Sequence, residues 1–355
     1  MKFFALICSN GLGHFKRVVG ILHALSGLEP GLEVSLLAPA GARERLRGWE
    51  KLAHPEWKWH FFPEGVKGVR WELEAGAYRD GSLLSWESLL EDLPAFWEAK
   101  VVLSDNLTGV LAHRPDAVLS GNFLWSDVLE KAWPAETAVQ EFVRRERALL
   151  KEHRPPMLCV ERLAMPSVKA LTEAVGLGFF AQGKRMPEKK NRPEARRARI
   201  AVLGGGTGMA RELLLQAVSD LAKAGFSSLS LAGDLLAEVR KAGSTEAEPF
   251  GFGPEDFYAV DMVICRPGVG TLTDCVQAGT PVLAVYEAGN VEMEYLGRRV
   301  EELGLGIDVA QSAVLPAVMK ALQDKNLRKY HSCLREQPLN GIEGAARFLL
   351  DKLRA

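Results

Sequence analysis

Two short segments of the sequence combine glycine with residues that can carry chemistry. The first, Asn10-Gly11-Leu12-Gly13-His14, comes directly after the apolar run 3–8. Glycines at such a position let backbone N–H groups approach a ligand, and a following helix presents its positive end. A free imidazole has a pKa of about 6.5, so His14 could accept a proton from a hydroxyl near neutral pH. A tight turn with His14 as a helix cap explains the same residues.

The second segment, Arg266-Pro267-Gly268-Val269-Gly270-Thr271, follows another apolar run. Its amide groups and the dipole of the expected helix suit a diphosphate. Asp274 lies about one turn into that helix, where a carboxylate can accept hydrogen bonds from both hydroxyls of a ribose. The alternative is a purely structural role, in which these residues form a capped helix with an exposed Asp.

A third glycine loop, "LGGGTG" at 203–208, offers Gly205, Gly206 and Thr207 as phosphate or sugar contacts. The loop lacks the Lys-Ser/Thr ending of a P-loop, which disfavours an ATPase of that kind. The loop that contains His14 lacks the third glycine of the dinucleotide fingerprint.

The elements that must position these loops alternate between strand and helix. We expect strands at 3–8, 33–38, 57–62, 116–121 and 157–164, a helix at 42–52, a loop at 63–82 and helices across 85–113. After the cationic segment 182–199 the alternation restarts. The pattern is typical of α/β, doubly wound parallel sheets, whose ligands bind outside the carboxyl ends of the strands.

This organisation predicts four parts. They are an N-terminal Rossmann-like domain at 1–182, a linker at 183–199, a C-terminal Rossmann-like domain at 200–331 and a final helix within 332–355.

Composition excludes several classes of protein. The formal net charge is −1, from 44 basic and 45 acidic side chains, so a general nucleic-acid binder is not expected. The five cysteines form no CxxC pair and the histidines show no metal spacing, so we expect a reduced, cytoplasmic chain without a metal site. The sequence contains no run of about twenty apolar residues, so we expect no transmembrane segment. Peripheral contact with a membrane stays open.

The segment 261–306 resembles the nucleotide-sugar signature of GT-B glycosyltransferases. It is similar to the transferase that adds N-acetylglucosamine to the peptidoglycan precursor, and to the macrolide- and plant-type UDP-glycosyltransferases. The residues that carry the resemblance are Asp261, Arg266, Gly268, Thr271, Asp274, Gly279, Pro281, Glu292 and Gly304. The chain departs from the pattern where the family has Glu instead of Asp274 and an acid-Gln pair instead of Glu292-Met293.

The resemblance implies a GT-B architecture of two Rossmann-like domains facing a central cleft, with the final helix crossing back to the first domain. It implies inverting, metal-independent transfer from a UDP-linked sugar to an acceptor hydroxyl, with no cofactor besides that co-substrate. His14 would be the general base, oriented by Asn122 or Asp127 after the strand at 116–121. The implied donor-binding residues are Gly11, Gly13, Arg17, Gly205, Gly206, Thr207, Phe252, Arg266, Gly268, Gly270, Thr271, Asp274 and Glu292.

Two other functions stay open. The fragment Gly11 to Arg17 also resembles the GxGHxxR pattern of nucleotide-sugar hydrolases of the same fold, in which Arg17 would face the donor phosphates, so a nucleotide-sugar hydrolase or epimerase is the second candidate. A catalytically silent nucleotide-binding protein is the third reading. The sequence does not indicate the acceptor, the donor sugar or the oligomeric state.

Overall fold

The chain divides into two compact units. A computed structural model describes residues 1–41, 52–64, 66, 68–72, 74–78, 83–189, 197–204, 208–242, 247–310 and 314–355. Unit 1 comprises Met1–Phe180 and Asn340–Ala355, and unit 2 comprises Ala181–Leu339. The helix expected at 42–52 falls almost entirely outside the described residues, as do parts of the loop at 63–82.

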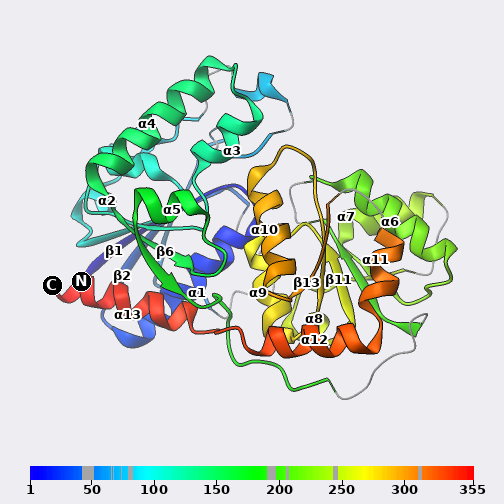
Figure 1. Cartoon of the computed structure of the whole chain (residues 1–355). Coiled ribbons are helices and arrows are strands. Elements are labelled where there is room, and N and C mark those ends of the chain that lie inside the picture. The colour runs from blue at the N-terminus through cyan, green and yellow to red at the C-terminus, as the bar shows by residue number, and fades with distance from the viewer. Residues whose placement is uncertain are drawn as a thin grey trace. The chain divides into compact units, whose positions relative to one another are not determined.

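Unit 1 is built on a parallel sheet with the strand order β3-β2-β1-β4-β5-β6-β7 in the described residues (Figure 1). Its strands are β1 (Lys2–Ile7), β2 (Glu33–Ala38), β3 (Lys58–Phe61), β4 (Val101–Asp105), β5 (Val118–Ser120), β6 (Pro156–Val160) and β7 (Glu173–Leu177). Its helices are α1 (Leu12–Leu28), α2 (Pro94–Glu98), α3 (Trp125–Ala132), α4 (Thr137–His153), α5 (Pro166–Leu171) and α13 (Gly341–Arg354), with 3-10 turns η2 (Ala75–Tyr78), η3 (Glu87–Leu90) and η4 (Thr108–Ala112).

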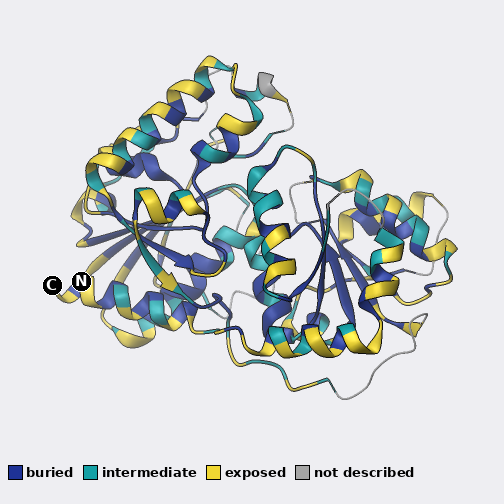
Figure 2. Cartoon of the chain, viewed as in Figure 1, coloured by how far each residue is buried: buried dark blue, intermediate teal, exposed yellow. Residues whose placement is uncertain are grey.

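The sequence of β1 and α1 explains how they pack. Residues 3–7 of β1 are all buried, as expected of a central parallel strand covered on both faces. Helix α1 has a buried face at the 3.6-residue period, made by Phe15, Val18, Val19, Leu22 and Leu25. Figure 2 shows the same division in both units, with buried strands and helices exposed on their outer faces.

Helix α13 completes unit 1 from the far end of the chain. It packs beside α1 (Figure 1). The amide of Gly341 donates to the carbonyl of Phe179 over 3.1 Å, and a Cβ on Gly341 would lie 2.4 Å from the carbonyl oxygen of Gly178. The helix therefore begins at a glycine because the two backbones approach too closely for a side chain.

Unit 2 holds a second parallel sheet, with the strand order β10-β9-β8-β11-β12-β13 in its described part. Its strands are β8 (Ile200–Leu203), β9 (Leu229–Leu231), β10 (Glu248–Pro249), β11 (Met262–Cys265), β12 (Val282–Val285) and β13 (Gly306–Ala310). Its helices are α6 (Arg211–Lys223), α7 (Gly233–Lys241), α8 (Pro254–Ala259), α9 (Val269–Ala278), α10 (Val291–Glu302), α11 (Val314–Ala321) and α12 (Asp324–Arg335).

The unit boundaries differ from the expected domain boundaries. Segment 183–189, expected as part of a free linker, is attached to unit 2 by Arg185. Its guanidinium donates to the carbonyls of Val276, Leu334 and Gln337 over 2.8, 2.9 and 2.5 Å. These carbonyls lie near the carboxyl ends of α9 and α12, where such groups lack helical partners. The chain returns to unit 1 at Asn340, not at 332, because α12 belongs to unit 2.

The prediction of helices across 85–113 is wrong in part. Between α2 and η4 the structure has a strand, β4. All five residues of β4 are buried, and the strand pairs with both β1 and β5. A strand this short shows no helical or alternating period, so tertiary pairing decides its structure.

In the described part of the chain, the helices are all too short or too polar to cross a bilayer.

The α1–α13 contact generates the first prediction. Leu349 of α13 is fully buried. Leu349→Ala is expected to lower the free energy of unfolding by about 3 kcal/mol, because it leaves a cavity in the core of unit 1. Urea denaturation followed by circular dichroism measures the change. The control is Arg347→Ala, which removes an exposed side chain of the same helix and should change stability by less than about 0.5 kcal/mol. Equal effects of the two substitutions would contradict the packing of α13.

Candidate active site

The His14 side chain is positioned by the turn between β1 and α1. Gly11, at the N-cap, has φ 94°, a backbone conformation that favours glycine. His14 is the third residue of α1, and its side chain is 12% exposed. Gly13 is half-buried beside it.

Asp105 reaches His14 because of the strand order. Strand β1 lies in the interior of the sheet, between β2 and β4. It pairs with β4 in a register that places Ile7 opposite Asp105. The carboxyl ends of β1 and β4 are therefore neighbours, at the point where the strand order reverses direction. Crevices at such switch points are the usual ligand sites of α/β sheets. His14 Nδ1 lies 2.5 Å from Asp105 Oδ1.

The carboxylate of Asp105 is completely buried and held by three side chains. Arg17 Nε donates to Oδ2 and Arg17 Nη2 to Oδ1, each over 2.8 Å, and Ser120 Oγ donates to Oδ2 over 2.9 Å. Burial alone would raise the pKa of Asp105, but the charges and hydrogen bonds of Arg17 and His14 outweigh it and lower the pKa to about 2. Asp105 is therefore ionised at neutral pH.

An ionised Asp105 fixes the tautomer of His14. A carboxylate can only accept, so the short contact requires a hydrogen on His14 Nδ1. The neutral ring then carries its lone pair on Nε2. Among the described residues, no hydrogen-bond partner is recorded for Nε2. This is the arrangement of an oriented general base, as in a His–Asp pair that deprotonates a hydroxyl.

The partner predicted for His14 is wrong. Asn122 donates to the carbonyl of Val160 over 3.0 Å, which fixes the turn after β5 to β6. Asp127 accepts from Ser167 and lies 3.9 Å from Arg147. The partners of these two side chains are therefore residues other than His14. The signal that could have identified Asp105 is an apolar run that ends in an acid, "VVLSD" at 101–105.

The role expected for Arg17 as a phosphate contact also differs from what the structure shows. Its side chain is 9% exposed, and its guanidinium is engaged by Asp105 and lies 6.0 Å from the centre of the Phe180 ring. The buried carboxylate of Asp105 holds the Arg17 side chain inside the fold. The guanidinium therefore compensates a charge of unit 1 itself.

In unit 2, four of the predicted donor-binding residues lie at the start of α9. Gly268 is the N-cap, Gly270 and Thr271 lie in the first turn, and Asp274 lies at the sixth helical position. No side chain caps this helix end. Strands β8 and β11 are the neighbours at which the order of this sheet reverses. The start of α9 therefore combines uncapped amides, a helix dipole and a switch point, which suits a phosphate.

Arg266 is held by an acid of its own unit. Its guanidinium makes a bidentate ion pair with Glu287, with Nε–Oε2 and Nη2–Oε1 distances of 2.9 and 2.6 Å. Asn290 Nδ2 also donates to Glu287 over 3.0 Å, and Asn290 caps α10 by accepting from the Met293 amide. Arg266 thus ties the loop after β12 to the end of β11. Because the guanidinium of Arg266 is paired with Glu287, its geometry does not favour the direct contact with the donor that the sequence predicted.

Glu292 and Phe252 occupy loops beside these helices. Glu292 is half-buried at the second position of α10. Phe252 lies between β10 and α8, is 44% exposed, and has φ 61°. A bulky residue seldom adopts that conformation, and such strain is concentrated at functional sites. The neighbouring amide of Gly253 donates to Asp256 over 2.7 Å, which fixes the loop.

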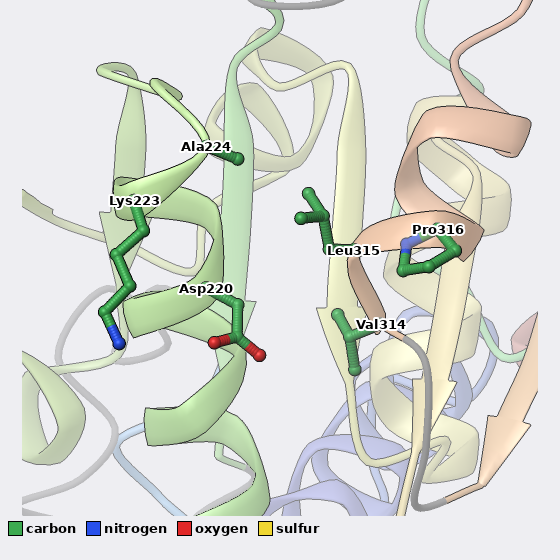
Figure 3. A pocket seen from close by; sticks show the side chains of 6 residues that line it. All are labelled: Asp220, Lys223, Ala224, Val314, Leu315 and Pro316. Atoms are coloured by element: carbon green, nitrogen blue, oxygen red, sulfur yellow. The ribbon is translucent and has the colours of Figure 1, made fainter.

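Gly205, Gly206 and Thr207 lie outside the described residues. Within the described ranges, no group of three or more His, Cys, Asp or Glu side chains is arranged to hold a metal ion. A pocket of about 460 Å³ lies between the end of α6 and the start of α11. Figure 3 shows the side chains that line it, Asp220, Lys223, Ala224, Val314, Leu315 and Pro316. None of the predicted site residues lines this pocket.

The buried carboxylate generates a prediction for stability and its pH dependence. Asp105→Asn should lower the free energy of unfolding at pH 7 by about 3 kcal/mol, because Arg17 stays buried without a counter-charge. The folded-state pKa of Asp105 is lowered from 3.8, so its ionised form stabilises the fold above about pH 4. That contribution, on the order of 2 kcal/mol, is lost as the pH falls towards 2.

Urea denaturation at a series of pH values tests this prediction. Subtracting the variant's stability from that of the wild type isolates the contribution of Asp105, and the difference should shrink from pH 4 to pH 2. Asp116→Asn is the control, since Asp116 also pairs with an arginine, Arg114, but is 60% exposed. It should cost less than about 1 kcal/mol. A difference that does not change with pH would refute the lowered pKa.

The known proteins that this chain is similar to are named as glycosyltransferases. No protein-family model matches the chain. An uncharacterized glycosyltransferase of Methanosarcina acetivorans is 24% identical to it over 387 residues, which cover 99% of this chain and 96% of the relative.

Several solved structures match over the full length of both chains, among them two different enzymes. Spinosyn rhamnosyltransferase SpnG superposes with a TM-score of 0.64 at 14% identity, and other structures of SpnG contain spinosyn aglycone or thymidine diphosphate. LpCGTa in complex with UDP superposes with a TM-score of 0.62 at 14% identity. The resemblance to GT-B glycosyltransferases is therefore confirmed for the fold: the chain has their architecture of two parallel, Rossmann-like units.

Proposed function

We propose that the protein is a glycosyltransferase that moves a sugar from a nucleoside-diphosphate donor, expected to be UDP-linked, to a hydroxyl of an acceptor. The observation that carries the proposal is the His14–Asp105 pair at the switch point of unit 1. The glycosyltransferase relative, and the nucleotide and aglycone complexes of the structural neighbours, support the same reaction class.

His14 acts as the general base in this reaction. The acceptor oxygen forms a bond to the anomeric carbon while its proton passes to Nε2. The bond from that carbon to the diphosphate oxygen breaks, and the nucleoside diphosphate leaves with the electron pair. Attack opposite the leaving group inverts the anomeric centre. Asp105 keeps the ring in the required tautomer and stabilises the imidazolium that forms.

The start of α9 binds the diphosphate of the donor. The amides of Gly268, Gly270 and Thr271 and the helix dipole offset the charge that develops on the leaving group, so the reaction needs no metal ion. Asp274 accepts hydrogen bonds from the ribose. Phe252 and Glu292 complete the donor site at the base and the sugar.

His14→Gln tests the assigned base. It is expected to reduce the rate of sugar transfer about 100- to 10,000-fold while leaving donor affinity within a factor of about two, because proton transfer is lost and donor contacts are kept. Single-turnover release of nucleoside diphosphate measures the rate, and calorimetry with UDP measures the affinity.

His23→Gln is the matched control. His23 lies on the same helix, but its ring contacts the carbonyl of Leu52, 2.9 Å away, so the rate should not change. Product analysis with and without an acceptor separates transfer from hydrolysis. Release of free sugar that needs no acceptor would assign the protein to the hydrolases, and an unchanged rate in His14→Gln would refute the base.

Asp274→Asn tests the ribose contact. Affinity for UDP should fall about tenfold or more, because hydrogen bonds to a charged acceptor are lost. Thymidine diphosphate has one ribose hydroxyl fewer, so its affinity should fall less. Isothermal titration of both nucleotides measures the two losses. Asp220→Asn, on α6, serves as the control and should leave both affinities unchanged. Equal binding of UDP by the wild type and Asp274→Asn would contradict the donor site.

A further inference from the structure

Arg17 is a buried residue that binds Asp105, the partner of the proposed base His14. It lies one helical turn after His14 and contacts both oxygens of Asp105. Oδ1 is shared between Arg17 Nη2 and His14 Nδ1, whereas Oδ2 accepts from Arg17 Nε and Ser120 Oγ. A carboxylate held at both oxygens by a rigid fork cannot rotate away from the imidazole.

The charges at this place sum to zero while His14 is neutral. Asp105 carries the negative charge and Arg17 the positive one. The other titratable groups that face them are Cys8, at the end of β1, and Cys159 of β6. Burial raises the pKa of Cys8 to about 12 and that of Cys159 to about 11, so both thiols are neutral. Among the described residues, Arg17 is therefore the cation that compensates Asp105.

We propose that Arg17 is a positioning residue that sets the proton affinity of the His14–Asp105 pair, so that Nε2 of His14 is unprotonated at neutral pH. This inference rests on the proposed role of His14 as a base. A buried His–Asp pair without a cation has net negative charge and takes up a proton more readily. Arg17 opposes that uptake by charge, and it preserves the geometry by its two parallel hydrogen bonds.

The effect on the base has the same sign wherever the extra proton lies. If His14 and Asp105 form an imidazolium–carboxylate pair, Nε2 carries a hydrogen. If Asp105 is protonated and donates to Nδ1, the neutral ring carries its hydrogen on Nε2 as well. Both states block the atom that must accept the acceptor's proton. Loss of Arg17 therefore moves the acid limb of the pH–rate profile, where the rate rises as the base loses its proton, to higher pH.

Arg17→Met tests the proposal by removing the cation and keeping an apolar side chain. The acid limb of the kcat/KM profile should move up by at least about one pH unit, a tenfold change in proton affinity. The C–H resonances of His14, assigned with His14→Gln, should titrate higher by the same amount. If the acid limb of the kcat/KM profile and the titration of the His14 resonances both match the wild type, the proposal is overturned.

A double variant keeps the test valid if Arg17→Met does not fold. Arg17→Met/Asp105→Asn removes both charges, and replacing a whole buried ion pair is far milder than removing one partner. The Asn oxygen can still accept from Nδ1. The proton affinity of His14 in this variant should be close to the wild-type value, and a shift as large as one pH unit upward would contradict charge compensation.

Arg114→Met is the matched control. Arg114 makes a bidentate pair with Asp116 over 2.8 and 2.7 Å, on unit 1, and has no contact with His14. Its loss should change stability without moving the acid limb. If the wild type transfers no sugar, the proposed function fails, yet the His14 titration still decides the role of Arg17. If transfer occurs and the limb does not move, the role of Arg17 alone fails.

Discussion

The structure of unit 1 depends on compensating one buried negative charge. A carboxylate removed from water is costly unless it is paired and hydrogen-bonded. Asp105 meets that condition through Arg17, His14 and Ser120, which come from α1 and β5. The same contacts that make burial of the charge tolerable also fix the imidazole. The network that stabilises the buried charge is therefore also the network that orients the proposed base.

Strand order brings these residues together. In unit 1 the reversal lies between β1 and β4, and in unit 2 it lies between β8 and β11. Asp105 ends β4, His14 lies in the first turn of α1 after β1, and the start of α9 follows β11. These residues thus lie at the switch point of their own unit, which is the usual ligand site of an α/β sheet. The two units therefore share one topology, with a glycine-containing turn at each switch point.

The strongly patterned parts of the chain were predictable from sequence. The apolar run of β1, the periodic face of α1 and the glycine turn before α9 have local signals, and they led to His14 and Gly268. Asp105 had only a weak local signal, the short apolar run that it ends, because β4 is defined by pairing with its neighbours. The ion pairs of Arg17 and Arg266 were missed for a related reason: sequence shows a cation near a glycine loop, but only the fold shows which acid reaches it. Both guanidiniums turn inward to acids that lie 88 and 21 residues away in the chain.

Helix α13 has a consequence for biosynthesis. Its buried side chains belong to unit 1, yet they are translated after all of unit 2. A nascent chain can assemble unit 2 while α13 is still in the ribosomal tunnel, whereas unit 1 then lacks the helix that packs on α1. Unit 1 is thus begun before unit 2 and completed after it.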